Sequence, residues 1–270
     1  MNYLNTITAC AMSILLPVSA VQADTPTPST QHGISATSIP QNHFGIGLDL
    51  SNSPSLYKAQ DNDHAANIHL KYRGQKFNMG RDSMSYKFLD KNKFQLEALL
   101  KSETRGYEAS SAKALAGLSD RDESLDLGFR AGYKTTYGLL SLDATQDVSN
   151  THKGHEADLR FGPDFYNETP SAQKKLALGV VAGLKWQSKE VVDYYYGVKS
   201  SEATASRAAY QGNAATTPYI GLDGKMNLSK KLSLSSSVLY MDRPDEISKS
   251  PLVDNDHNIQ INAGLTYWFH

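Results

Sequence analysis

The 270-residue sequence contains one cysteine, Cys10, within its first 23 residues. The remaining chain therefore lacks the residues for a disulfide, a thiol nucleophile or cysteine-bound zinc. The sequence also has no excess of positive or negative charge, because 27 basic and 28 acidic residues give a formal charge of −1. This balance gives no indication of a nucleic-acid partner. After the N-terminal region, no apolar run approaches the roughly 18 residues of a membrane-spanning helix. A helical inner-membrane protein is thereby excluded.

The N-terminal region has the layout of a secretory signal peptide. Residues 1–23 carry no charged side chain, and an apolar stretch from Ala9 to Leu16 is followed by Val21-Gln22-Ala23. We expect cleavage between Ala23 and Asp24, and no lipidation at Cys10, because the apolar run lies mostly after it. Residues 24–42 are rich in Thr, Pro and Ser and are predicted to be a flexible lead-in. Residues 43–270 then form one domain.

From His43 onward the sequence alternates between apolar and polar residues, the period of a β-strand with two different faces. The clearest segments are Leu176–Trp186, Leu125–Tyr133 and Ile259–Phe269. Shorter segments share the pattern: Phe44–Leu50, Ile68–Tyr72, Phe94–Leu100, Leu140–Ala144, Ala157–Phe161, Ile220–Leu228 and Leu232–Tyr240. Two less regular candidates are Lys76–Met79 with Tyr86–Phe88, and Val191–Val198. The pattern predicts about 12 strands of roughly 8 to 12 residues, enough for tilted strands to cross a bilayer.

A soluble β-sandwich would alternate in the same way. Three features favour a closed antiparallel transmembrane β-barrel. Charged residues recur on the polar faces, Tyr outnumbers Phe 15 to 8, and aromatic residues gather at the ends of the apolar faces. These aromatics are Tyr133, Trp186, Tyr240, Tyr267 and Phe269. They are typical of interfacial girdles around a hydrated lumen. Closure is required because hydrocarbon cannot hydrogen-bond a free strand edge.

An even strand number predicts that both termini lie on the periplasmic side. Pairing hairpins backward from the C-terminus makes Arg243–Asp256, Lys199–Thr216 and Gly162–Gln173 long external loops. Ser229–Lys231 and Gln187–Glu190 become tight periplasmic turns. Glu103–Asp122 is too long for the short turn that this register requires, so the register near residues 75–122 is open by one strand.

The polar strand faces predict a lumen with charges of both signs. The residues singled out are Asp126, Arg130, Asp143, Asp158, Arg160, Lys185 and Asp223. Further charges on the same faces include Asp49, Glu97, Lys71, Arg73, Lys101 and Lys225. Mixed signs favour ion pairs between strands. A lumen filled by its own side chains and a narrow, weakly selective pore both fit a barrel of this size.

No motif indicates catalysis. His152-Lys153-Gly154-His155-Glu156 offers two imidazoles and a carboxylate, but it lacks a helix to align the histidines and a nearby third ligand, so a solvated loop is the preferred interpretation. A Gly-x-Ser-x-Gly elbow is also missing. We expect no enzyme, no cofactor and no metal, although a Ser/His/Asp site at the barrel rim is defined by geometry that sequence does not give.

Several motifs together resemble the MipA/OmpV family of outer-membrane barrels. The most specific is Asp193-Tyr194-Tyr195-Tyr196-Gly197-Val198. The others are Gly45–Leu48, Arg105-Gly106-Tyr107, Leu115–Arg121, Leu125–Gly128, Glu202-Ala203, Ala209-Tyr210, Pro218–Leu222 and Ser250–Asp254. His270 after the terminal aromatic and the Ser/Thr/Pro-rich lead-in depart from the family pattern.

The resemblance implies a scaffold in the cell outer membrane that contacts a periplasmic murein lytic transglycosylase and a murein synthase, with outer-membrane lipid and lipopolysaccharide around the barrel. It also implies, as an alternative, a surface adhesin or antigen that uses its external loops. The family provides no catalytic residues to assign here. A narrow solute pore and, third, an outer-membrane enzyme remain as alternatives. The Asp193–Gly197 block has a purely structural interpretation too, as an interfacial tyrosine belt.

Overall fold

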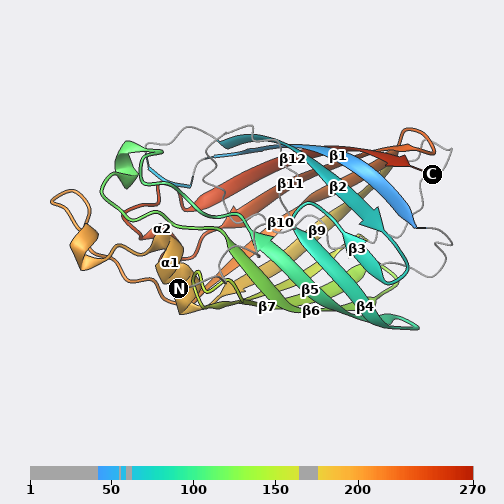
Figure 1. Ribbon diagram of the computed structural model, residues 1–270, viewed down its shortest axis with the longest axis horizontal. Coiled ribbons are helices and arrows are strands. Elements are labelled where there is room, and N and C mark those ends of the chain that lie inside the picture. Colours follow the sequence, from blue (N-terminus) through green and yellow to red (C-terminus); the bar gives the residue numbers. More distant parts are fainter. Residues whose placement is uncertain (1–41, 55, 59–62, 164–175, 270) are drawn as a thin grey trace, which may run out of the picture.

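The computed structural model describes residues 42–54, 56–58, 63–163 and 176–269. The predicted cleavage site Ala23–Asp24, almost all of the lead-in and His270 lie outside these residues. The described strands form one closed barrel in which every strand is antiparallel to its chain neighbours and β1 pairs with β12 (Figure 1). The strands are β1 (His43–Ser53), β2 (Asp63–Arg73), β3 (Phe77–Met79), β4 (Ser83–Lys91), β5 (Phe94–Glu103), β6 (Ser124–Lys134), β7 (Leu139–Asp147), β8 (His155–Gly162), β9 (Leu176–Gln187), β10 (Ala215–Asn227), β11 (Leu232–Asp242) and β12 (His257–Phe269).

The predicted fold class and strand number are confirmed. The number is right because two errors in the predicted strands compensate each other: one strand was missed and one was added. Residues 76–88, predicted as one irregular segment, form the two strands β3 and β4 around a turn at residues 80–82. Val191–Val198, predicted as a strand, belongs mainly to the helix α1 (Lys189–Tyr196). The tertiary environment overrides the β-propensity of Val and Tyr there, because side chains at 191, 192, 195 and 196 share one buried helical face.

The outer face of the barrel is apolar, as lipid requires. Ile68, Leu127, Leu178 and Ile220 are among many large apolar side chains that are at least half exposed on it. Aromatic rings mark both ends of this face. Phe44, Tyr72 and Phe77 form a row of tilted rings near the start of β1, with ring centroids 4.7 and 5.7 Å apart. Trp186 and Tyr240 lie toward the opposite end and are about two-fifths exposed.

None of the helices in the described ranges is long and apolar enough to cross a membrane.

The connections differ in length between the two ends of the barrel. The end that holds the start of β1 and the end of β12 also holds the tight connections 74–76, 92–93, 135–138 and 228–231. We refer to it as the terminal end. The opposite end holds the long connections 104–123, 188–214 and 243–256. Short periplasmic turns and longer external loops are the usual arrangement of such barrels, so we expect the terminal end to face the periplasm.

Two of the predicted loop positions are wrong. Gln187–Glu190 is not a tight turn at the terminal end, because it leads into α1 at the long-loop end. The connection predicted as Gly162–Gln173 follows β8 at the terminal end, not at the long-loop end, and most of it lies outside the described residues. Both errors follow from counting Val191–Val198 as a strand, which inverts the connections back to the merged segment 76–88. Without that strand, the long segment 104–123 takes its place beside the other long loops.

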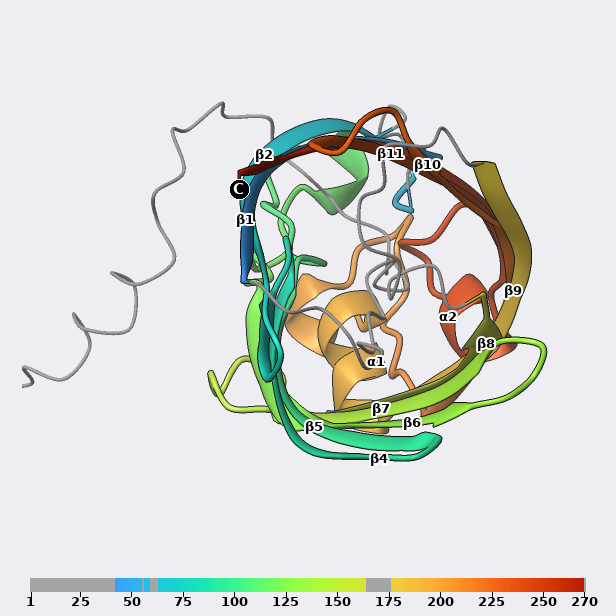
Figure 2. The ribbon, with the colours of Figure 1, turned by 90° about the vertical axis from the view of Figure 1, so that its right-hand side faces the viewer.

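The long loops pack together into a cap over one end of the barrel. Here "cap" means the described parts of the connections 54–62, 104–123, 188–214 and 243–256, including α1 and the short α2 (Asp245–Ser248). In the view along the barrel axis both helices fall within the ring of strands (Figure 2). The cap has its own apolar core, formed by Leu56, Tyr57, Tyr107, Leu115, Leu118, Val191, Val192, Tyr195, Tyr196, Val198, Ala215, Ile247, Leu252 and Val253.

Candidate functional site

The lumen of the barrel is crossed by buried ion pairs. The structure places all seven singled-out charged side chains in buried positions on the inner face of the strands. Arg130 of β6 donates from Nε and Nη2 to the two carboxylate oxygens of Asp143 on β7, both at 2.7 Å. Arg160 of β8 donates to Asp223 on β10. The bidentate Arg130–Asp143 pair fixes geometry as well as charge between neighbouring strands, and the Arg160–Asp223 pair spans the intervening strand β9.

Below the cap, five charged side chains meet in one cluster. Its members are Lys101, Glu103, Arg105, Glu156 and Lys185, all at least nine-tenths buried. Arg105 contacts Glu156 and lies 2.9 Å from Glu103, while Lys185 lies 3.4 Å from Glu156 and 3.8 Å from Glu103. Three cations and two carboxylates leave an excess positive charge. The Arg105 guanidinium lies 4.8 Å from the ring centroid of Tyr195, which ties the cluster to α1.

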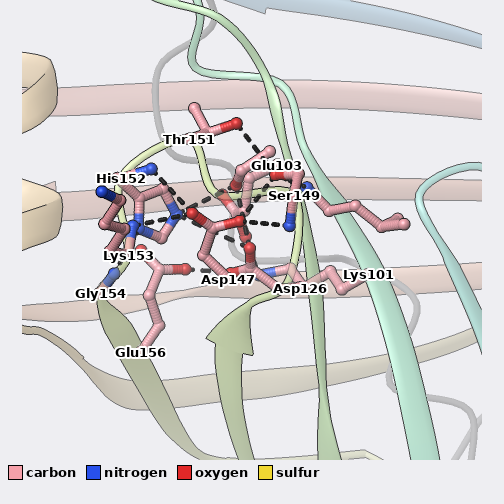
Figure 3. A network of polar contacts seen from close by, with 12 residues as sticks. Lys101, Glu103, Asp126, Asp147, Ser149, Thr151, His152, Lys153, Gly154 and Glu156 are labelled. Atoms are coloured by element: carbon pink, nitrogen blue, oxygen red, sulfur yellow. Dashed lines mark hydrogen bonds and ion pairs between the residues drawn. The ribbon is translucent and has the colours of Figure 1, made fainter. Parts of the chain in front are cut away.

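Asp126 and His152 lie together (Figure 3), and Ser124 contacts both, but the three do not form a catalytic triad. Both Ser124 Oγ, at 3.0 Å, and Asp126 Oδ1, at 3.6 Å, face the same nitrogen of His152, Nε2. The other nitrogen, Nδ1, accepts a hydrogen bond from the Gly154 N–H at 3.0 Å. A triad needs the carboxylate on one nitrogen and the hydroxyl on the other. The three side chains are buried, and their geometry is that of a structural network.

Asp147 holds the loop between β7 and β8 by its carboxylate. It accepts hydrogen bonds from the main-chain N–H groups of Ser149, His152 and Lys153 at 2.7 to 2.8 Å (Figure 3). This arrangement explains the motif around His152 and His155 as a turn in which His152 points inward. Among the residues that the structure describes, no group of three or more His, Cys, Asp and Glu side chains could hold a metal ion.

Arg121, Glu202 and Arg207 connect the loops 104–123 and 188–214 of the cap through hydrogen bonds. Glu202 accepts from the N–H groups of Ser119 and Lys199, each at 3.0 Å, and from Arg121 at 3.3 Å. Burial alone would raise the pKa of Glu202, but these hydrogen bonds lower it to about 2. Arg207 donates to the carbonyl oxygen of Ala114 at 2.8 Å. The loops 104–123 and 188–214 are thereby joined across the mouth of the barrel.

The most specific family motif, Asp193–Gly197, lies at the end of α1, and its tyrosine side chains point in two directions. Tyr195 and Tyr196 are fully buried in the cap core, whereas Tyr194 is only partly buried. Asp193 accepts a hydrogen bond from the Gly212 N–H at 2.9 Å. The helix ends at Gly197. A Cβ atom on this residue would lie 2.2 Å from the Asp193 carbonyl oxygen. The interpretation as an interfacial tyrosine belt is therefore wrong for Tyr195 and Tyr196, because they pack inside the cap.

The terminal half of the lumen contains a polar cavity of about 110 Å³. Four cationic residues and two carboxylates line it, together with hydroxyl and amide side chains from β11 and β12 and the ring of Trp268. These residues include Asp49, Lys71, Arg73, Arg81, Asp223, Lys225, Ser233, Ser235, Ser237, Asn262, Thr266 and Trp268. Trp268 is buried, and the Arg73 guanidinium lies 5.3 Å from its ring centroid.

Sequence reasoning missed the cap as a site. Arg105, Arg121, Glu202 and Arg207 were not singled out, because each lies in a segment without periodicity. Their signal was present in the motifs that carried the family resemblance. Arg105-Gly106-Tyr107, Leu115–Arg121, Asp193–Val198, Glu202-Ala203 and Ser250–Asp254 all fall in the cap. The resemblance is thus concentrated where distant loops meet.

Fold and sequence together define an outer-membrane β-barrel with one capped end. The model of the family MltA-interacting protein MipA matches residues 46–269, and the chain belongs to this family. Outer membrane protein OmpV of Vibrio cholerae is 26% identical over 224 residues, which span 80% of this chain and 83% of the relative. The putative outer membrane protein YiaT of Escherichia coli K12 is 23% identical over 84% of this chain and 91% of its own length. The protein is located in the outer membrane.

A third relative is named for the protein with which it interacts. The MltA-interacting protein of Escherichia coli K12 is 28% identical over 153 residues, which span 56% of this chain and 59% of that protein. Among solved structures, an outer membrane channel from Pseudomonas putida F1 matches with a TM-score of 0.42 and 12% identity over 87% of this chain and 97% of that chain. A FadL homologue from Pseudomonas aeruginosa gives 0.40 and 10% identity over 86% and 91%.

Proposed function

We propose that this protein is a non-catalytic scaffold that holds a murein lytic transglycosylase, and through it a murein synthase, at the periplasmic face of the outer membrane. The observation that carries the proposal is the asymmetry of the barrel. Its long loops 104–123, 188–214 and 243–256 pack into a cap with an apolar core, whereas the connections 74–76, 92–93, 135–138 and 228–231 at its terminal end are short. Membership of the MltA-interacting protein family supports a partner at that end.

The cap also argues against an open solute channel. Its core side chains, such as Tyr57, Tyr195 and Leu252, are fully buried, and ion pairs cross the lumen beneath them. A barrel whose lumen is filled by its own side chains suits a rigid support better than a pore. Ser124 Oγ is buried in its network with Asp126 and His152, which supports a structural role for these three residues.

The scaffold is tested by co-purification of the tagged protein from membranes in mild detergent, with the bound proteins identified by mass spectrometry. We expect a lytic transglycosylase in stoichiometric amount. Its recovery should fall at least about fivefold when the terminal-end turn Ser229–Lys231 is replaced by Gly-Asn-Gly. The matched control is the double substitution Asp245→Asn and Lys249→Gln, which alters the exposed outer surface of the cap. Equal loss in both variants, or recovery of the barrel alone, refutes the scaffold.

A second candidate is recognition of an external ligand or surface by the cap. An open depression of about 770 Å³ lies on the cap, and its lining includes Glu190, Asp193, Tyr194, Lys199, Tyr210 and Gln211. Tyrosine rings beside charged groups are common at binding surfaces. Binding of intact cells to a host surface, lost on Tyr194→Ala but retained on replacement of Ser229–Lys231, would favour this candidate over the scaffold.

A further inference from the structure

A small cavity lies where the cap meets the long-loop end of the barrel strands. Its volume is about 10 Å³, which is room for one water molecule or an ion of similar size. Its lining joins α1, the loop 243–256 with α2, and the strands β10, β11 and β12. The lining residues are Tyr196, Thr217, Met241, Arg243, Ile247 and Asn258. A molecule bound in this cavity would therefore contact both the cap and the barrel wall.

The polar side chains around the cavity are buried and lack hydrogen-bond partners. Tyr196, Arg243 and Asn258 are 0%, 7% and 1% exposed. The Tyr196 hydroxyl, the Nη2 atom of Arg243 and both polar atoms of the Asn258 amide make no hydrogen bond. Buried polar atoms in folded proteins are nearly always paired, so several unpaired ones around a single cavity indicate a binding site.

Arg243 brings a positive charge that forms no ion pair with any carboxylate of the described residues. Its Nη1 atom donates to the carbonyl oxygens of Asn255 and His257, at 2.8 and 3.0 Å, which fixes the guanidinium in its loop. The carboxylate of Asp256 is exposed and contacts His257 instead. Burial lowers the pKa of Arg243, as expected for a cation taken out of water without an ion-pair partner. Its Nη2 group is thus a charged donor at the cavity.

Arg207 shows that a buried arginine of the cap can be satisfied without an anion. Its guanidinium donates to the carbonyl oxygens of Ala114, Ala116 and Glu202. None of its nitrogen atoms is buried without a partner in the described structure. Arg243 has no such carbonyl group at Nη2, so the unpaired charged donor is specific to the small cavity and is not a general property of the cap.

The surroundings of the cavity add to its positive charge. Thr217 lies directly opposite Lys185 in the pairing of β10 with β9. Burial raises the pKa of Tyr196, and the nearby charge of Arg105 opposes this rise. The cavity therefore adjoins the charged cluster below the cap, in which three cations meet two carboxylates. With Arg243 the excess of positive charge increases further, and in a buried region this favours an anion over a neutral water molecule.

We propose that the cavity is a binding site for a single halide ion, which in the cell is chloride. Arg243 Nη2 and the Tyr196 hydroxyl donate to it, and the Asn258 amide presents its Nδ2 atom. A volume of about 10 Å³ excludes a carboxylate or phosphate group, and Met241 and Ile247 supply apolar walls around a monatomic ion. Chloride thereby holds the cap on the barrel strands and stabilises its closed position. The proposal does not depend on the scaffold function.

Amide hydrogen exchange of the protein in neutral detergent micelles tests whether chloride stabilises the cap. Sodium chloride replaces sodium gluconate at constant ionic strength, so that the screening of surface charges stays the same. Exchange of residues 189–197 and 243–250 should slow about tenfold once chloride exceeds its Kd about tenfold, because only the closed cap binds the ion. Exchange of the terminal-end connection 135–138 should not respond to chloride.

Two pairs of variants separate an anion site from a merely structural contact. Asn258→Asp places a carboxylate beside Arg243, so exchange should be slow and independent of chloride. The matched control Asn262→Asp, on the same face of β12, should keep the wild-type response. Arg243→Gln should abolish the response. Its control Arg207→Gln, which removes a buried cap arginine without an unpaired nitrogen, should speed exchange but retain the response to chloride.

Crystals grown in sodium bromide locate the ion directly, because bromide scatters anomalously. We expect one bromide within hydrogen-bond distance of Arg243 Nη2, and none at this position in Asn258→Asp. Exchange of the cap that does not depend on chloride overturns the proposal, and so does a response that both Asn258→Asp and Arg243→Gln retain. Ordered density in the cavity without a bromide signal also overturns it, since the site would then hold a water molecule.

Discussion

Arg121 and Glu202 form a buried ion pair at 3.3 Å that joins two loops separated by 81 residues of sequence. The same guanidinium donates to the carbonyl oxygen of Tyr194 at 2.6 Å and to that of Ser119 at 2.8 Å. One side chain therefore links loop 104–123 to α1 and to the segment after it. Together with the hydrogen bonds from Arg207 to the Ala114 carbonyl oxygen and from the Ser119 N–H to Glu202, this contact sets the relative position of the two halves of the cap.

Acid should loosen the cap through Glu202. The pKa of this carboxyl is lowered to about 2, below its ordinary value of 4.5, so its contribution to stability is fully present above pH 4.5 and is lost as the pH falls through 2. We expect amide hydrogen exchange of residues 114–121 and 199–207, corrected for the intrinsic rate, to increase between pH 4.5 and 2. The variant Glu202→Gln should show increased exchange already at pH 7 and little further change with acid. A wild-type cap whose corrected exchange is flat to pH 2 would contradict the role of this contact.

The lumen pair Arg130–Asp143 should be costly to break singly. Arg130→Met leaves a buried carboxylate without its cation, which we expect to lower the free energy of unfolding by about 3 kcal/mol. The double substitution Arg130→Met and Asp143→Leu should cost less than Arg130→Met alone, because no charge is then stranded. Urea unfolding in phospholipid vesicles, followed by tryptophan fluorescence, measures both values.

The exposed pair Asp245–Lys249 provides the comparison. Its side chains are mostly exposed, and such pairs contribute little to stability because solvent screens them. If Lys249→Met destabilises the protein as much as Arg130→Met, burial is not what gives the lumen pair its importance.

The sequence predicted the regular part of the barrel well, for a physical reason. In β9 the two faces meet lipid and lumen, so the alternation from Leu176 to Trp186 is unbroken and the strand is unambiguous. The break between β3 and β4 was missed because β3, before Gly80-Arg81-Asp82, has only three residues, which leaves too few alternations to mark a separate strand. The lumen charges were placed because a strand's period is short and regular.

The helix α1 could not be predicted from its local sequence pattern. Val191-Val192-Asp193-Tyr194-Tyr195-Tyr196 has the composition of a strand, and its helical state depends on contacts with Arg105, Tyr57 and Ser250, which are distant in sequence. Gly197 and the preceding Ser188 were local signs of helix ends. They were outweighed by β-propensity, and this error changed the predicted side of each loop between the merged segment 76–88 and α1.

A bulky residue at Gly212 should dislodge the cap without unfolding the barrel. A Cβ atom at this position would lie 2.7 Å from the Asp193 main-chain nitrogen and 2.8 Å from the Val192 carbonyl carbon. Gly212→Val should therefore push loop 188–214 away from α1 and break the hydrogen bond from Gly212 to Asp193. We expect more frequent and larger conductance steps in planar bilayers than for the wild type. The control Ala209→Val places the same side chain at an exposed position of the same loop. Identical conductance of the two variants would mean that the cap does not close the barrel.

The outer face should respond to charge according to its depth in lipid. Ile220 lies in the middle of the apolar belt and Val148 lies in the loop between β7 and β8, and both side chains are 54% exposed. Ile220→Arg should lower the free energy of unfolding in vesicles by about 2 to 4 kcal/mol, because the charge must leave water at the bilayer midplane. Val148→Arg should cost no more than about 1 kcal/mol, because its side chain already lies in water or among headgroups. In detergent micelles, which deform around a charge, the difference should shrink. Equal costs in vesicles would place Ile220 outside the hydrocarbon, and the apolar belt would then have to be assigned to other strands.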